Sequence, residues 1–94
     1  MAKNISWLVT ANNSYLAVLG YLMDQGAYKA AQKLDNELVK WLNILREFPA
    51  SGVLTKKRNA RKLLLAKHYL IIYTELQDKI VVTAFIDTRS DHSY

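Results

Sequence analysis

The end of the chain carries the side chains best suited to chemistry. Arg89 follows the apolar pair Phe85-Ile86, and His92 and Tyr94 come shortly after it. Arginine binds phosphate through paired hydrogen bonds, histidine exchanges protons near neutral pH, and tyrosine can stack on a base. With Arg61 these side chains could cleave RNA without a metal, since attack by a 2′-hydroxyl needs acid–base help and charge neutralisation. The alternative is a frayed, polar terminus.

A second candidate is a basic segment in the second half of the chain. No acidic residue lies between Glu47 and Glu75, whereas six basic residues do. They are Lys56, Lys57, Arg58, Arg61, Lys62 and Lys67. In a chain of net charge +5 and pI near 9.6, this cluster makes a positive field that attracts phosphate backbones or acidic proteins. The alternative is a strand edge that charge protects from aggregation.

Other kinds of site leave no signature in the sequence. The three glycines, at positions 20, 26 and 52, are too far apart for a phosphate-binding glycine loop. His68 and His92 lack the spacing of helical metal ligands, and there is no cysteine. We therefore expect no metal and no cofactor. The absence of cysteine, of a signal peptide and of an apolar run near the roughly 18 residues of a membrane span favours a cytoplasmic protein with no membrane contact.

The first half of the chain predicts one strand and two helices. Residues 4–10 alternate between apolar and polar side chains, which predicts a strand, and residues 11–14 supply helix-capping side chains. A short helix then ends at Gly26, a residue suited to the left-handed position after a helix. A second helix begins at Ala27, carries one apolar stripe, and is stopped by Phe48-Pro49. The two form a helical hairpin.

The second half predicts strands, because the hydrophobic period falls to two. Strands are expected over 61–67, 69–76 and 79–88, with a possible short one over 53–57. The tight link at 77–78 makes the later strands an antiparallel meander. The prediction is a single α+β domain over residues 1–94, with an N-terminal strand, a helical hairpin and a C-terminal meander, the helices packed on one sheet face.

The second face of this sheet is unexpectedly apolar. A sheet covered by helices on one side normally has a polar opposite face, whereas here we assign Leu70, Ile72, Val81 and Phe85 to that face. A partner protein would cover them. The alternative is a curved sheet whose concave side is filled by the segment near Val53-Leu54.

Taken in order, these segments resemble the RelE/ParE family of toxins. The motifs that carry the resemblance are Leu45-Arg46-Glu47-Phe48-Pro49-Ala50-Ser51-Gly52, Arg61-Lys62-Leu63, Tyr69-Leu70-Ile71-Ile72-Tyr73 and Asp87-Thr88-Arg89. The resemblance runs from about Ser6 to Arg89. It implies the toxin of a bacterial type II toxin–antitoxin pair, neutralised by a cognate antitoxin that covers Leu70, Ile72, Val81 and Phe85. Operator DNA would then be reached only through the antitoxin.

The resemblance leaves two targets open. RelE-like members cleave messenger RNA on the ribosome and carry an arginine in the middle strand, where this chain has Leu70. ParE-like members inhibit DNA gyrase and carry Arg-x-Asp after the last strand, matched by Arg89-Ser90-Asp91. We favour the ParE-like interpretation, in which Arg89 and the basic segment contact the target. The alternative is a metal-free endoribonuclease that uses Arg61, Arg89, His92 and Tyr94, because the ending His92-Ser93-Tyr94 is similar to that of some ribonuclease members.

Overall fold

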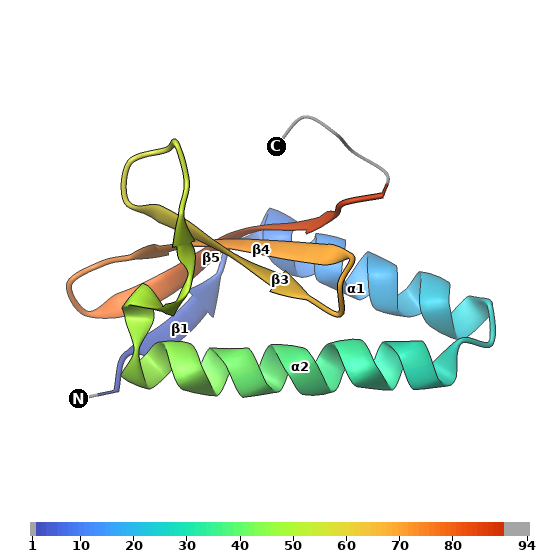
Figure 1. Cartoon of the computed structure of the whole chain (residues 1–94). Helices are drawn as coiled ribbons and strands as arrows, with labels where there is room; N and C mark the ends of the chain where they lie inside the picture. The colour runs from blue at the N-terminus through green and yellow to red at the C-terminus, as the bar shows by residue number, and fades with distance from the viewer. Residues whose placement is uncertain (1, 90–94) are drawn as a thin grey trace.

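The computed structural model describes residues 2–89, in which one mixed sheet packs against two helices (Figure 1). The elements are β1 (Asn4–Trp7), α1 (Val9–Asp24), α2 (Tyr28–Glu47), the 3-10 turn η1 (Pro49–Ser51), β2 (Val53–Leu54), β3 (Ala60–Leu65), β4 (Tyr69–Glu75) and β5 (Lys79–Asp87). The strand order is β1-β5-β4-β3-β2, with β1 parallel to β5 and the other pairs antiparallel. The predicted α+β fold is confirmed, and β1 joins the meander beside its last strand.

The helical hairpin supplies one side of the core. In α2 the apolar stripe buries Leu34, Leu38 and Leu45 completely or nearly so. In α1 the buried residues are Ala11 and Tyr15. The Tyr15 hydroxyl donates a hydrogen bond to the Asp35 carboxylate of α2, and burial together with this partner raises the pKa of Tyr15. Within residues 2–89, neither helix is both long and apolar enough to cross a membrane.

The start of the first helix differs from the prediction. The strand ends at Trp7 instead of continuing through Thr10, and the four residues assigned as caps lie inside α1. Leu8 is the residue before the helix and makes no side-chain capping bond. A helix that begins at Val9 brings Ala11 and Tyr15 onto the sheet, so tertiary packing outweighs the local alternation and the capping preference.

A bulge in β5 reverses the alternation of side chains along that strand. Val82 pairs with Tyr73 and Ala84 pairs with Ile72, so Thr83 is an extra residue with no cross-strand partner. Its hydroxyl donates to the Ile72 carbonyl, 3.2 Å away. Even-numbered residues such as Ile80 and Val82 therefore face the helices before the bulge, and odd-numbered residues face them after it.

The placement of Phe85 on the second sheet face is wrong for this reason. Phe85 pairs with Ile71 of β4, faces the helices, and is only 5% exposed. Its ring lies 5.2 Å from that of Tyr15 in an edge contact and 5.6 Å from that of Tyr69 in a stacked one. The ring is thus part of the core and is closed to any partner protein.

A buried tyrosine hydroxyl holds the segment that follows α2. The Tyr73 hydroxyl donates to the Pro49 carbonyl at 2.7 Å and accepts from the Gly52 N–H at 2.8 Å. A Cβ at position 52 would lie 2.6 Å from this oxygen and 3.0 Å from the Lys62 carbonyl. Only glycine therefore fits there. The Arg61 guanidinium adds bonds to the carbonyls of Ala50 at 3.2 Å and Gly52 at 2.8 Å.

The close approach at Gly52 predicts opposite effects of the same substitution at two glycines. Gly52→Ala should lower the free energy of unfolding by about 1–3 kcal/mol, because the new methyl group must displace Tyr73 or the backbone of β3. Gly20→Ala should raise it by about 0.5–1 kcal/mol, since position 20 lies in a helix and nothing lies within 4 Å of a methyl group placed there. Urea denaturation of both variants tests this. Equal stability of the two variants would contradict the close contact of Gly52 with Tyr73 and β3.

Candidate functional site

The side chain of Arg89 is held in a fixed position at the end of β5. Its Nε donates to Asp87 Oδ1 at 3.1 Å and one terminal nitrogen donates to Asp87 Oδ2 at 3.2 Å, a two-bond contact. The Arg89 backbone N–H also donates to Asp87 Oδ1, at 2.9 Å. These hydrogen bonds hold the pKa of Asp87 below its usual value and raise that of Arg89. The Arg89 side chain is nevertheless 53% exposed, so its charge faces solvent.

Tyr69 of β4 supplies the floor of this arrangement. Its hydroxyl accepts a hydrogen bond from the Arg89 guanidinium at 3.0 Å, and the guanidinium carbon lies 5.4 Å from the ring centroid. Tyr69 and Asp87 are cross-strand partners. Tyr69 also stacks on Phe85, so the position of Arg89 is coupled through two aromatic rings to the core.

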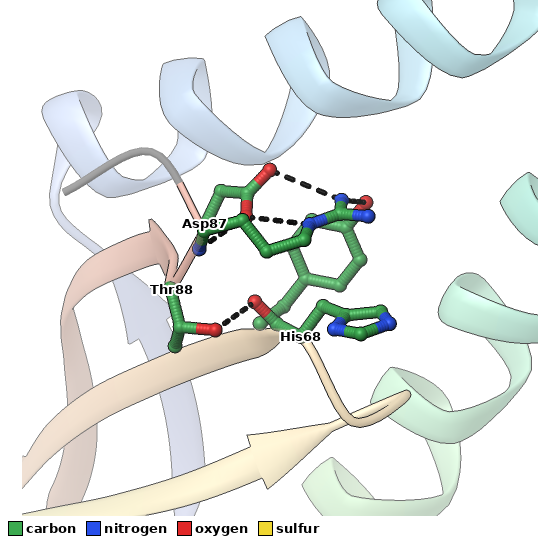
Figure 2. Close-up of polar contacts among 5 residues, drawn as sticks. His68, Asp87 and Thr88 are labelled. Carbon is green, nitrogen blue, oxygen red and sulfur yellow. Dashed lines mark hydrogen bonds and ion pairs between the residues drawn. The ribbon is translucent and has the colours of Figure 1, made fainter.

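The turn between β3 and β4 fixes the end of β5. Both the backbone N–H and the hydroxyl of Thr88 donate to the carbonyl of His68, at 2.8 and 2.9 Å (Figure 2). His68 also makes the smallest contribution to the lowered pKa of Asp87, after the hydrogen bonds and the charge of Arg89. From the sequence alone, His68 is considered only as a metal ligand. Knowing that Tyr69 pairs with Asp87 would have shown that the neighbouring His68 lies at the same end of the sheet as Arg89.

A shallow depression of about 460 Å³ adjoins Arg89. It is lined by Ala17, Val18 and Tyr21 of α1 and by Tyr69, Asp87 and Arg89 of the sheet. One wall is thus apolar and aromatic, and the other carries the Asp87–Arg89 ion pair, in which the Arg89 side chain is the more exposed partner, at 53% against 26%. Such a surface suits an acidic or phosphate group that is accompanied by an apolar or aromatic one. We call these six residues the Arg89 surface.

Arg61 lies too far from Arg89 to share a small site with it. Arg61 pairs with Tyr73, whereas Arg89 is bonded to Tyr69, the first residue of β4. Four residues of strand separate those tyrosines, roughly 13 Å. The Arg61 guanidinium is also engaged with the carbonyls of Ala50 and Gly52. Of the predicted ribonuclease set, the structure therefore separates Arg61 from Arg89, while His92 and Tyr94 lie outside the described residues.

The basic segment is divided between two ends of the sheet. Lys56, Lys57 and Arg58 are exposed in the loop between β2 and β3, which rises on the side of the sheet away from α2 (Figure 1). Lys67 is exposed in the turn between β3 and β4, at the same end as Arg89. Lys62 is half-buried and lies on the outer sheet face. The predicted cluster is therefore not one continuous patch, and only Lys67 accompanies Arg89.

The outer sheet face, opposite the helices, carries an apolar band. Leu64, Leu70 and Ile86 lie side by side across three strands, and Ile72 pairs with Ala84 next to them. Leu70 is buried between its neighbours, whereas Ile72 and Val81 are half-buried. Leu64, which the sequence pattern did not single out, is 54% exposed. The band is thus real, with Leu64, Ala84 and Ile86 in place of Phe85.

The alternative interpretation of this face is wrong. Val53 and Leu54 do not fill a concave side of the sheet. They form β2, pair with Lys62 and Arg61 at the sheet edge, and are both largely exposed. Over residues 2–89 the structure brings together no group of three or more histidine, aspartate or glutamate side chains that could hold a metal ion.

Comparison with known proteins gives a match in structure and none in sequence. No protein-family model matches the chain, and no curated protein matches it. A solved structure described as the chromosomal ParDE TA system from P. aeruginosa contains a similar chain, with a TM-score of 0.70 and 15% sequence identity. The match covers 92% of this chain and 96% of that one. At this identity the likeness establishes a shared fold.

The lowered pKa of Asp87 predicts how the ion pair depends on pH. Asp87→Asn should reduce the free energy of unfolding by about 0.5–1 kcal/mol at neutral pH, a small effect because Arg89 is half exposed. The difference in the free energy of unfolding between the variant and wild type should have its full value above the ordinary aspartate pKa of 3.8. It should disappear as pH falls through the lower folded-state pKa, because the carboxylate is then protonated in both states. Urea denaturation across this range tests it. A difference that grows on acidification would contradict the assignment.

Proposed function

We propose that this chain is the toxin of a bacterial type II toxin–antitoxin pair and that it acts on DNA gyrase. The observation that carries the proposal is the shared fold with a chain of the ParDE system, which extends over nearly the full length of both chains. The sequence resemblance supports it independently, because the Phe-Pro-x-x-Gly segment and the terminal Asp-Thr-Arg occupy defined structural positions. The Phe-Pro-x-x-Gly segment is hydrogen-bonded to the Tyr73 hydroxyl, and the Asp-Thr-Arg segment contributes Asp87 and Arg89 to the Arg89 surface.

The Arg89 surface is the proposed contact with the target. Arg89 is held by Asp87 and Tyr69 before any partner arrives, so little side-chain entropy is lost when it binds. The neighbouring Tyr21 is exposed and could close over a bound group. A preformed cation beside an exposed aromatic residue is typical of the residues that dominate the energy of protein interfaces.

Two observations support gyrase inhibition over the alternative, messenger RNA cleavage. First, Arg61 pairs with Tyr73 whereas Arg89 is bonded to Tyr69, four residues away along β4, and the Arg61 guanidinium is bonded to backbone carbonyls. Second, β4, the middle strand of the meander, has Leu70 where RelE-like ribonucleases carry an arginine, and a leucine cannot neutralise phosphate charge. Cleavage would then depend on Arg89, His92 and Tyr94.

The proposed antitoxin covers the outer sheet face. The band of Leu64, Leu70, Ile72, Val81 and Ile86 is apolar, and both helices pack on the other side of the sheet. Lys62 lies on the same face. An antitoxin segment that is apolar along one side and acidic at its edge would complement both features.

Growth inhibition by three variants tests the target assignment. At matched expression, Arg89→Ala should weaken growth inhibition, because the loss of a preformed charged contact costs tenfold or more in affinity, on the order of 1.4 kcal/mol. Arg46→Ala is the control, since Arg46 is an exposed arginine of α2 outside the proposed surface. His92→Ala should remain fully toxic, and the wild-type chain should inhibit DNA supercoiling by gyrase.

The ribonuclease alternative makes the opposite prediction for His92→Ala. If that variant is folded but harmless, and wild-type protein cleaves messenger RNA on translating ribosomes, the gyrase assignment is wrong. An Arg89→Ala variant as toxic as the Arg46→Ala control would exclude the Arg89 surface as the target contact, whatever the target.

A separate pair of variants tests the antitoxin surface. Leu64→Asp places a charge in the apolar band at a side chain that is 54% exposed, and Leu54→Asp makes the same change at an edge residue that is 63% exposed and paired with Arg61. Both should fold. Co-expression with the protein encoded beside this gene should rescue growth for wild type and Leu54→Asp, and rescue should be weaker for Leu64→Asp. Equal rescue of both variants would place the antitoxin elsewhere.

A further inference from the structure

The solvent side of α1 carries an apolar stripe that the proposed function does not use. Val9, Leu16 and Met23 are spaced by seven residues, so they lie along one line of the helix, and they are 74%, 53% and 49% exposed. Gly20 lies on the same line, and nothing lies within 4 Å of a methyl group placed there. The stripe is separate from the Arg89 surface, to which α1 contributes Ala17, Val18 and Tyr21.

Charge distinguishes this stripe from the remainder of the surface. The chain has a net charge of +5, so two copies repel one another at most orientations. From Val9 to Met23, however, α1 contains no charged residue. The solvent side of α2, by contrast, carries Lys29, Lys33 and Lys40. The stripe of α1 is therefore a place where two copies can meet without opposing charges.

We propose that this stripe is a weak self-association surface, on which α1 packs antiparallel against α1 of a second copy of the chain. The proposal goes beyond the toxin function and does not depend on it. The stripe is self-complementary, as a two-fold contact requires. Leu16 lies at its midpoint, so a two-fold axis there places Leu16 against Leu16 of the other copy and Val9 against Met23 of the other copy.

The polar residues of the stripe fit the same register. Because Leu16 faces Leu16 and Val9 faces Met23, Asn12 faces Gly20 of the other copy. Because glycine has no side chain, the helices can approach closely at that point and leave room for an asparagine amide. A polar residue within an apolar helix seam favours one register over others. A contact made by one helix from each copy is small, below the roughly 1,200 Å² of stable interfaces, so the dimer should form only at high concentration.

Analytical ultracentrifugation of the full chain tests the association. The mass should rise from 10.8 kDa toward twice that value between micromolar and near-millimolar concentration. Leu16→Asp should stay monomeric. Val39→Asp is the matched control, because Val39 is a similarly exposed aliphatic residue of α2, at 51%, and this variant should still associate. Gly20→Arg should also stay monomeric without loss of folding, since its side chain meets open space in the single copy.

Cysteine cross-linking tests the register. The chain has no native cysteine, so every disulfide must come from the introduced residues. A disulfide needs Cα atoms about 4.4–6.8 Å apart. Leu16→Cys should form a disulfide-linked dimer on mild oxidation. Val9→Cys should not, because the two copies of residue 9 would lie roughly 21 Å apart along the helix axis. Val9→Cys combined with Met23→Cys should cross-link again.

Either of two results would overturn the proposal. One is a wild-type chain that remains monomeric at every concentration, which would leave the stripe without a second copy. The other is association that persists in Leu16→Asp and Gly20→Arg, or cross-linking of Val9→Cys as efficient as that of Leu16→Cys. Neither result bears on growth inhibition, so failure of this proposal is distinguishable from failure of the toxin assignment.

Discussion

The extra residue in β5 determines on which side of the sheet the side chains of the candidate site lie. With Thr83 bulged out, Phe85 and Asp87 turn toward the helices, in line with Ile71 and Tyr69 of β4. Without it, strict alternation would put both on the outer face. The bulge therefore places the Phe85 ring between those of Tyr15 and Tyr69. It also brings Asp87, and with it Arg89, beside α1. The Thr83 hydroxyl donates to the Ile72 carbonyl and so ties the bulge to β4.

The segment after α2 gives a physical reason for the Phe-Pro-x-x-Gly motif. Pro49 stops the helix and offers its carbonyl to Tyr73, and Gly52 provides both the N–H and the space that this hydroxyl requires. Burial raises the pKa of Tyr73, so the hydroxyl stays protonated and can keep donating to Pro49. Phe48 itself is exposed and makes no contribution to the core. The motif thus anchors the end of the helical hairpin to the sheet, through Tyr73 of β4 and Arg61 of β3.

The sequence predicted the fold class, the order of elements and the strand bounds within a few residues, because hydrophobic periodicity depends on local spacing. The sequence-based predictions were wrong where residues distant in the sequence determine the local structure. The bulge at Thr83 is fixed by pairing with β4, so the face of Phe85 could not be read from alternation in β5 alone. The start of α1 is fixed by packing of Ala11 and Tyr15 on the sheet. Arg89 was singled out by residue type and position, but its contact with Tyr69 depends on the register of β4 and β5, which no local pattern contains.

We have proposed that the chain binds a protein target through the Arg89 surface and an antitoxin through the outer sheet face. Equilibrium binding of the purified wild-type chain to purified DNA gyrase tests this most directly. The predicted result is saturable binding that weakens as the salt concentration rises, because the contact is partly ionic. Absence of binding to gyrase, with cleavage of messenger RNA when the same preparation meets translating ribosomes, would contradict the claim.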